Sequence, residues 1–412
     1  MENKKTAFTE SVAFIASILS KMDGIGHCRS KVFMDCFRLF LSIPYRINFL
    51  QMGRYGLFSE KTYRTFFSGK FDFLGFNTRL VDAVCGGDRF IALDPSYLPK
   101  SGKKTHWLGR FWSGVAGEVK KGLEVTGLAL VDVGQGAAYH LEAVQAPCAA
   151  SLEKEGKTLV GHYLDVVTAR ADKLKQLAGY LVADAYFAKK DFVDGVLNVG
   201  LHLICRLRRD AAMMYPFTGE RKKGRGRPKV YDGKVDWGKI DMRHFTLLTD
   251  MPEYRLHGAV LYSKGLKRKV KVAFVQLKKK DGAIGGRRIF FSTDLDMDGQ
   301  AIFERYRLRF QIEFLFRDAK QHTGLAHCQA LSGNKLYMHV NLALTAVSVA
   351  RAVHWAELPN RENTPFSMKD IKVLYFNMLL ADRFFTMFEI DHQNTKNHAA
   401  VEEFYAWGAR AA

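Results

Sequence analysis

Proline and cysteine are scarce in this sequence, and neither low-complexity tracts nor internal repeats occur. Nine prolines in 412 residues, with 48% hydrophobic and 13% aromatic residues, exclude a disordered chain and allow sizeable buried cores. The six cysteines form no CxxC pair and no regular framework, which excludes a disulfide scaffold and favours a reducing compartment. A chain of this length is too long for one ordinary core, so we expect two or three globular domains.

Long hydrophobic runs are also missing. The apolar run at residues 12–19 follows Glu10 and precedes no small-residue cleavage site, so we interpret it as a helix rather than a signal peptide. The longest later run, residues 340–350, is too short to span a bilayer and is followed by Arg351. We therefore expect a soluble, cytoplasmic protein with no membrane partner.

Acidic residues are outnumbered by basic ones, 42 to 62, which gives a formal net charge of +20. Residues 206–290 hold 23 Lys and Arg against 8 Asp and Glu, so 15 of the 20 excess charges lie in this one segment. It contains a loop punctuated by Gly and Pro, GRGRPK, and strands with basic alternation. This composition suits contact with a polyanion such as nucleic acid. The alternative is a charged surface that only serves solubility.

The first 75 or so residues predict helices. Aromatic residues recur there at helical spacing: Phe33, Phe37, Phe40. The stretch INFLQMGRYGLFSEKTYRTFF has the pattern of a helix-turn-helix, in which Gly56 ends one helix and Ser59 caps the next. Lys61 and Arg64 would then be exposed on a recognition helix that contacts DNA. A tight helical hairpin with a charged outer face is the alternative.

Two apolar strands are each predicted to end in an aspartate. RFIALD ends in Asp94 and is stopped by Pro95, and GYLVAD ends in Asp184. Asp132, at the end of LALVD, is a rival for the first position. Alternating segments after Asp94 predict an antiparallel meander, followed by a helix at residues 162–178. The predicted order is three antiparallel strands, helix, strand, helix, strand.

The stretch YRLRFQIEFLFRDAK, residues 306–320, predicts an amphipathic helix with a chemically equipped face. Its apolar stripe follows helical spacing: Leu308, Ile312, Leu315, Ala319. Four polar residues fall within an arc of roughly 60° on the other face: Tyr306, Arg309, Glu313, Lys320. A carboxylate between two cations and a phenol suits a metal ligand beside phosphate-binding groups. The alternative is a solvated face on which Glu313 pairs with Arg309 or Arg317.

The spacing Tyr-x2-Arg-x3-Glu-x6-Lys resembles the Tyr-Arg-Glu-Lys (YREK) signature of bacterial insertion-sequence DDE transposases of the insertion sequence family four type. The resemblance covers about residues 88–330 and is best at the three acidic motifs. It implies an α/β fold with a ribonuclease-H-like catalytic core. In that fold the first strand lies beside the fourth, and a start at Asp132 leaves too few strands before the helix. The topology therefore favours Asp94. Pro95 stands where a polar residue is common in the family.

The resemblance also implies roles for the polar residues. Asp94, Asp184 and Glu313 would form a catalytic triad that binds two Mg²⁺ ions, for which Mn²⁺ can substitute. DNA phosphates around the cut would be contacted by three residues: Tyr306, Arg309, Lys320. Further phosphate contacts are expected from the basic loop: Arg221, Lys222, Lys223, Arg225, Arg227. Trp237 is predicted to stack on a base flipped out near the cut, with a core position as the alternative.

The implied layout has five parts. A helical N-terminal DNA-binding domain occupies residues 1–80, and a helical C-terminal region occupies residues 361–412. The ribonuclease-H-like core consists of residues 88–207 and 291–360. A basic, β-rich insertion domain at residues 208–290 interrupts the core.

By resemblance, the protein is a transposase that nicks transposon ends, frees them and joins their 3′-ends to target DNA, commonly through a hairpin at the transposon end. The implied partners are double-stranded DNA, both terminal inverted repeats and target, and a second copy of the chain in the DNA complex. The implied setting is the bacterial nucleoid. Two alternatives remain: a metal-dependent DNA nuclease of the same fold that cleaves without joining, and a domesticated DNA-binding protein that does not transpose. Terminal inverted repeats beside the coding sequence and a nicking assay would separate them.

Overall fold

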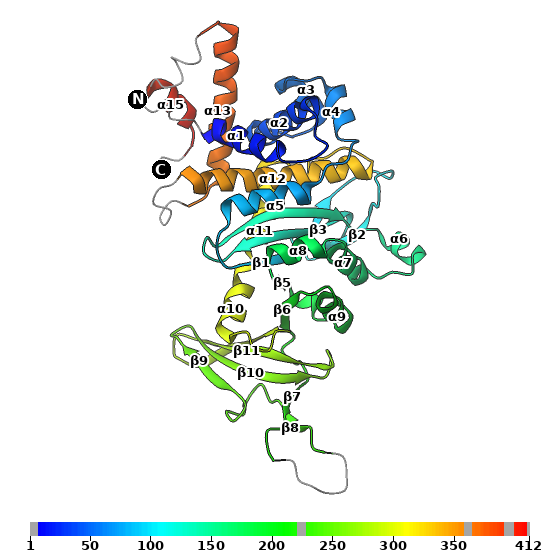
Figure 1. Ribbon diagram of the computed structural model, residues 1–412, viewed down its shortest axis with the longest axis vertical. Helices are drawn as coiled ribbons and strands as arrows, with labels where there is room; N and C mark the ends of the chain where they lie inside the picture. The colour runs from blue at the N-terminus through cyan, green and yellow to red at the C-terminus, as the bar shows by residue number, and fades with distance from the viewer. Residues whose placement is uncertain (1–6, 221–227, 358–364, 391–398, 410–412) are drawn as a thin grey trace.

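A layer of helices that share an aromatic core forms the N-terminal part of the protein (Figure 1). The computed structural model describes residues 7–220, 228–357, 365–390 and 399–409. The predicted phenylalanine stripe is confirmed, since Phe33, Phe37 and Phe40 are fully buried. The ring of Phe33 stacks on that of Phe71, with centroids 4.0 Å apart. The helices of this layer are α1 (Ala7–Leu19), α2 (His27–Ser42), α3 (Phe49–Tyr55), α4 (Glu60–Phe66) and α5 (Phe73–Val84).

The turn between α3 and α4 has the predicted ends. Gly56 follows α3, and the Ser59 hydroxyl caps α4 by accepting a hydrogen bond from the backbone N–H of Thr62. Asp35, buried on α2, accepts hydrogen bonds from the hydroxyl of Tyr63 and the N–H of Leu57. A buried carboxylate therefore fixes this turn, because its loss would leave buried donors unpaired.

One large mixed sheet runs through the molecule. In the described part of the chain its strand order is β2-β3-β1-β5-β6-β12-β11-β10-β7-β8, with β4 paired to β3 and β9 to β10. Strand β1 (Arg89–Pro99) is antiparallel to β3 (Glu118–Asp132), which also pairs with β2 (Gly109–Ser113) and β4 (Ala137–Gln145). On its other side β1 is parallel to β5 (Tyr180–Val182), and β5 is parallel to β6 (His202–Leu207).

The prediction that Pro95 stops the first strand is wrong, because β1 continues to Pro99 and pairs with β3 throughout. Val133 N donates to Asp88 O at the start of this ladder. Hydrogen-bonded pairs alternate along an antiparallel ladder, so the nitrogen of Pro95 faces away from β3. On that side β5 has already ended at Val182. Proline is tolerated here because no partner strand needs the missing N–H.

Helices cover both faces of the central strands (Figure 1). On one face, α5, α12 (Gly333–Glu357) and α11 (Gln311–His322) pack on β4. The other face carries α7 (Leu159–Thr168), α8 (Ala171–Leu177) and α9 (Lys190–Asn198), beside the short α6 (Ala149–Lys154). The prediction of one helix over residues 162–178 is wrong, because α7 ends at Thr168 and α8 begins at Ala171. Between them lies Arg170, whose guanidinium donates to Glu142 on β4 at 2.5 Å.

Helix α12 is long and apolar enough, by length and composition, to cross a membrane. The apolar run at residues 340–350 is the middle of this longer helix. However, 94% of its apolar window is buried inside the protein. That is the environment of a core helix, since membrane helices show their apolar side chains to lipid.

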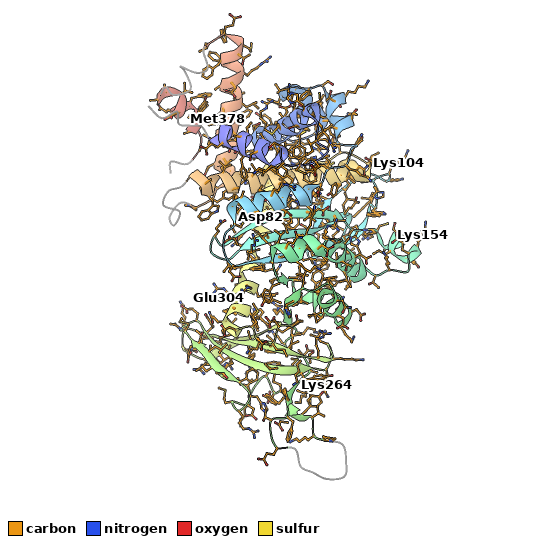
Figure 2. All side chains as sticks on the ribbon, in the orientation of Figure 1. Asp82, Lys104, Lys154, Lys264, Glu304 and Met378 are labelled. Atoms are coloured by element: carbon orange, nitrogen blue, oxygen red, sulfur yellow. The ribbon has the colours of Figure 1, made fainter. Side chains whose placement is uncertain are left out.

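The basic segment extends the central sheet. Strand β12 (Ile284–Ser292) pairs with β6, and the sheet continues through β11 (Arg268–Lys278) to β10 (Tyr254–Ser263). The remaining strands here are β7 (Met213–Pro216), β8 (Tyr231–Lys234) and β9 (Thr246–Asp250). Helix α10 (Gly299–Leu308) packs on this part of the sheet. Figure 2 shows Lys264 at its surface, as it shows Lys104 and Lys154 elsewhere; all three are exposed.

The C-terminal helices are α13 (Met368–Met387) and α15 (Ala399–Ala406), which contact each other. Helix α13 packs on α2, where the buried Lys372 amine donates to Phe40 O at 2.6 Å. Burial lowers the pKa of Lys372 to about 7. The helical character predicted for both ends of the chain is thus observed in the described residues.

Candidate active site

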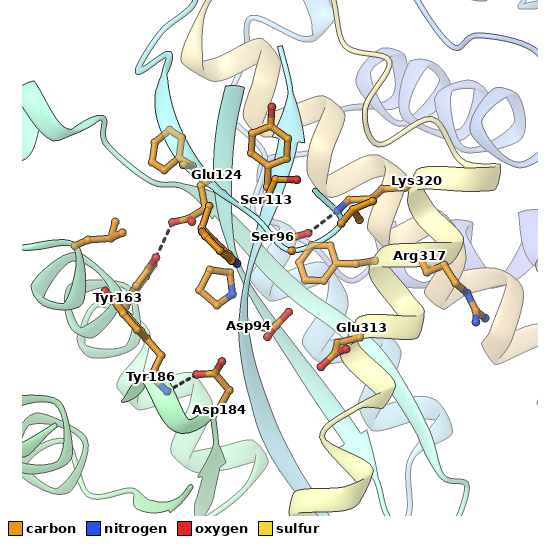
Figure 3. A pocket seen from close by; sticks show the side chains of 18 of the residues that line it. Asp94, Ser96, Ser113, Glu124, Tyr163, Asp184, Tyr186, Glu313, Arg317 and Lys320 are labelled. Atoms are coloured by element: carbon orange, nitrogen blue, oxygen red, sulfur yellow. Dashed lines mark hydrogen bonds between the residues drawn. The ribbon is translucent and has the colours of Figure 1, made fainter. Parts of the chain in front are cut away.

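The three predicted acids line one groove of about 1090 Å³ (Figure 3). Asp94 comes from β1, Asp184 from the turn after β5, and Glu313 from α11. The parallel register pairs Ile91 with Leu181 and Ala92 with Val182, so two residues further along Asp94 lies opposite Asp184. The prediction that Asp94 ends its own strand is therefore wrong, because β1 continues to Pro99. Asp94 lies instead just past the end of β5, the parallel neighbour of β1.

Asp184 is held by the backbone around it. Its Oδ1 accepts a hydrogen bond from the N–H of Tyr186 at 2.8 Å, which caps the short 3₁₀ turn η1 (Ala185–Phe187). Its carbonyl oxygen accepts from the thiol of Cys205 on β6 at 2.8 Å. The side chain is thereby oriented at the end of β5, where residues of parallel strands project into a common crevice.

The predicted single helix over residues 306–320 is wrong. Helix α10 ends at Leu308, and α11 begins at Gln311. The break separates Tyr306 from Glu313 and Lys320, so the four polar residues do not share one helix face. Glu313 and Lys320 line the groove, whereas neither Tyr306 nor Arg309 is among the described residues that line it.

Arg309, at the break, bridges two of the acids. Its guanidinium lies 3.2 Å from Oδ1 of Asp94 and 2.7 Å from Oε1 of Glu313. Arg309 is itself buried, and its carbon Cζ lies 5.7 Å from the ring centroid of Tyr306. The sequence offered a pair between Arg309 and Glu313 as one alternative, and this pair is present. Because Arg309 also contacts Asp94, it links α11 to β1.

The electrostatics of the groove centre on Asp94. Burial raises the pKa of Asp94 to about 7; the nearby carboxylates of Glu313 and Asp184 add to the shift, and Arg309 and Lys320 oppose it. Lys320 donates to the Ser96 hydroxyl at 2.9 Å, and burial lowers the pKa of its amine. A buried carboxylate among like charges favours any cation that can reach it.

Tyr306 has a packing role. Its ring lies 4.6 Å from that of Phe290 on β12, and burial raises the pKa of its hydroxyl to about 12. Its ring lies beside the guanidinium of Arg309, and Tyr306 does not line the groove. The phosphate contact predicted for Tyr306 is therefore not favoured by this position.

Glycine at position 127 lets α11 approach the sheet. Gly127 pairs with Asp94 across β1 and β3, and a Cβ there would lie 2.5 Å from Phe316 Cζ on α11. We expect Gly127→Ala to cost about 1–3 kcal/mol by overpacking and to lower the DNA cleavage that the family resemblance implies, because α11 carries Glu313. Thermal unfolding and cleavage assays would measure both effects. Phe316→Leu should restore part of each in the double variant.

The matched control is Gly134→Ala, since the nearest atom to a Cβ at Gly134 is 3.5 Å away. That substitution should change neither stability nor cleavage appreciably. If Gly127→Ala behaved like the control, close packing of Phe316 would not be what positions α11.

A metal ion would meet a suitable donor set here. The three carboxylates supply oxygen ligands, which hard divalent cations prefer. However, within the described residues no group of three or more His, Cys, Asp or Glu side chains is gathered closely enough to hold an ion. The guanidinium of Arg309 contacts both Asp94 and Glu313, so these two acids are joined through it in this structure.

The remaining predicted residues lie elsewhere. Asp132, the rival acid, is buried and accepts from the N–H of Gln135 at 2.9 Å, which is the role of a turn residue. Lys61 and Arg64 are exposed on α4, although Arg64 pairs with Glu60 and its Cζ lies 5.0 Å from the ring centroid of Phe49. The five basic loop residues lie outside the described residues: Arg221, Lys222, Lys223, Arg225, Arg227.

Trp237 occupies a packed position. Its indole N–H donates to Ala211 O at 3.0 Å, and its ring lies 5.1 Å from that of Phe274 on β11. It does not line the groove. These contacts favour the core alternative over base stacking, although residues 235–240 form no strand.

Two groove features were missed in the sequence. Glu124, on β3, is buried and accepts from the Tyr163 hydroxyl at 2.6 Å. A charged residue at a buried position of an apolar strand is a signal that could have found it. Trp112, on β2, lines the groove and is 59% exposed. The alternation of side chains along a strand predicts that Trp112 is exposed, but not that it lies in the groove.

The acids and cations of this groove have the character of a phosphoryl-transfer site, and the fold fits an α/β nuclease of the DDE type. Residues 58–249 match the family model described as DDE superfamily endonuclease, and residues 161–349 match that described as Transposase DDE domain. Asp184 lies in both matches. No curated protein matches the chain significantly. The two matches support a transposase or DDE endonuclease, a nuclease-type enzyme that acts on DNA, from a class that generally uses divalent metal ions.

Proposed function

We propose that the protein is a cut-and-paste DNA transposase and that Asp94, Asp184 and Glu313 are its catalytic acids. The observation that carries the proposal is the parallel register of β1 and β5, which sets Asp94 opposite Asp184 in a groove that Glu313 also lines. The order β4-β3-β1-β5-β6 has antiparallel strands on one side of β1 and parallel strands on the other. This order supports a ribonuclease-H-like layout.

The proposed catalytic residues come from β1, from the turn after β5 and from α11. Asp94, Asp184 and Glu313 would hold two Mg²⁺ or Mn²⁺ ions, which supply activation of the attacking water or 3′-hydroxyl and stabilisation of the leaving oxygen. Lys320, anchored by Ser96, is oriented to bind an oxygen of the scissile phosphate. In-line attack on the phosphorus would follow from this arrangement, and no covalent enzyme intermediate is needed.

The DNA partner is proposed to bind along basic surfaces outside the groove. The strands of the basic segment expose cations such as Lys264, Lys267 and Lys269, and Lys61 and Arg64 lie exposed on α4. We propose that these surfaces bind terminal inverted repeats, that two copies of the chain assemble on the DNA, and that cleavage passes through a hairpin at the transposon end. The YREK spacing supports the insertion sequence family four type.

An endonuclease that cleaves without joining is the second candidate, because the family matched by residues 58–249 is described as an endonuclease. A supercoiled plasmid that carries a marker between the two DNA sequences flanking the gene separates the candidates. With MgCl2, a transposase nicks at the marker's ends, excises the marker and joins it to a second plasmid. Cleavage without joined product would favour the endonuclease. End binding without cleavage would favour a DNA-binding regulator.

A further inference from the structure

An exposed tryptophan stands on the rim of the candidate groove without a partner of its own. Trp112 lies on β2, the strand at one end of the sheet order. Among the described residues, none stacks on its ring or accepts a hydrogen bond from its indole N–H. Trp237, in contrast, makes both kinds of contact. Single exposed apolar side chains are normal on protein surfaces, so it is the position of Trp112 in the groove that argues for a binding role.

The strand that carries Trp112 is fixed at both ends. At its start, a Cβ on Gly109 would lie 2.9 Å from Cβ of Cys148, so the strand packs tightly there. At its end, the N–H groups of Ala116 and Gly117 donate to Ser113 O and close the turn to β3. The indole is thereby presented on a rigid hairpin, which lowers the entropy lost on binding.

The neighbours of Trp112 are suited to nucleic acid. Arg110, two residues earlier on the same exposed face of β2, also lines the groove, and its partner across the strands is Lys121. Tyr186, also exposed in the groove, is covered by the Lys189 amine 3.9 Å from its ring centroid. Aromatic rings interleaved with cations are the pattern that binds single-stranded nucleic acid.

We propose that Trp112 is a stacking platform for an unpaired DNA base beside the cut, with Arg110 binding an adjacent phosphate. This rests on the proposed function, since it assigns a substrate contact to the same groove. A groove of about 1090 Å³ is large enough for more than the phosphate that the three acids would engage. A base pulled from the helix would leave its phosphate accessible to the acids, and the indole would offset the lost stacking.

The test compares two probes in buffer with EDTA: fluorescein-labelled oligo(dT), and the same strand in a blunt duplex with oligo(dA). Trp112→Ala should weaken binding of the single strand about 5- to 100-fold and of the duplex less than about twofold. Trp112→Phe, which retains a ring, should recover most of the loss. Trp407→Ala is the matched control, because Trp407 is 75% exposed but lies beyond α15, away from the groove. It should change neither affinity.

Equal losses on both probes, or none, would overturn the stacking role. A change in oligomeric state of Trp112→Ala on gel filtration would also overturn it, and would assign this rim to a protein contact. These outcomes differ from failure of the proposed function, in which the unmodified protein itself neither binds DNA nor cuts the plasmid.

Discussion

Asp94→Asn, Asp184→Asn and Glu313→Gln should each reduce plasmid cleavage about 1000-fold or more, while DNA binding stays within a few-fold of the unmodified protein. The amides keep the shape of each side chain and remove its charge. All three acids line one groove, yet they come from separate elements that single substitutions would not unfold. Cleavage of the marker plasmid in MgCl2 and gel-shift binding would measure the two effects.

Two other carboxylates serve as matched controls. Glu124→Gln changes an acid of the same groove that is already bound to Tyr163, and Asp132→Asn changes the rival acid at the turn after β3. We expect less than about tenfold loss of cleavage for both, because the Glu124 carboxylate is already engaged by Tyr163 and Asp132 does not line the groove. A folded Asp132→Asn protein without cleavage, or a triad variant that still cut at nearly the normal rate, would contradict the assignment.

The pH dependence of stability tests the raised pKa of Asp94. Because burial raises the pKa of Asp94 to about 7, the folded protein retains a proton that the unfolded chain loses near pH 4. Ionising Asp94 therefore costs stability as the pH rises from about 4 to about 7. Asp94→Asn has no proton to lose, so its metal-free stability relative to the unmodified protein should improve across that window. Urea unfolding at several pH values would show this.

The strands that carry Asp94 and Asp184 were predictable from sequence because their signals are local. An apolar run before Asp94 and another before Asp184 determine where the strands lie, and the parallel register then brings the two carboxylates together. Likewise Ser59 and Gly56 mark helix ends through contacts within a few residues. Signals that span only a few residues can be recognised in the sequence without a structure.

The helix break at Arg309 was not predictable in the same way. The apolar spacing continues through residues 306–320, and nothing in that stretch is a helix breaker. The contact that accompanies the break joins Arg309 to Asp94, which is 215 residues away in the chain. The extension of β1 through Pro95 has a similar origin, because it depends on where β5 ends. Tertiary contacts override local preference at both positions.

Arg309→Ala should have the largest effect on stability. Its guanidinium bridges Asp94 and Glu313 at 3.2 and 2.7 Å, and its removal leaves the buried Asp94 and the partly exposed Glu313 without this partner. Breaking a buried pair typically costs about 3–5 kcal/mol; partial exposure of Glu313 reduces our expectation to about 2–3 kcal/mol. Cleavage should also fall, on the order of 100-fold, through misplacement of the acids. Urea unfolding and the plasmid assay would measure these losses.

The sharper consequence is the response to metal. In the unmodified protein, a divalent ion bound by Asp94 and Glu313 would have to displace the guanidinium that joins them, whereas in Arg309→Ala neither acid would have that partner. Because a ligand that binds only the folded state stabilises it in proportion to the logarithm of its concentration over Kd, MgCl2 should raise the unfolding temperature more in the variant. Arg305→Ala is the control, since Arg305 pairs with Asp88 outside the groove. Its response to MgCl2 should match that of the unmodified protein. An equal metal response in Arg309→Ala would mean that the guanidinium does not compete for the acids, and that Arg309 acts only as a strut between α11 and β1.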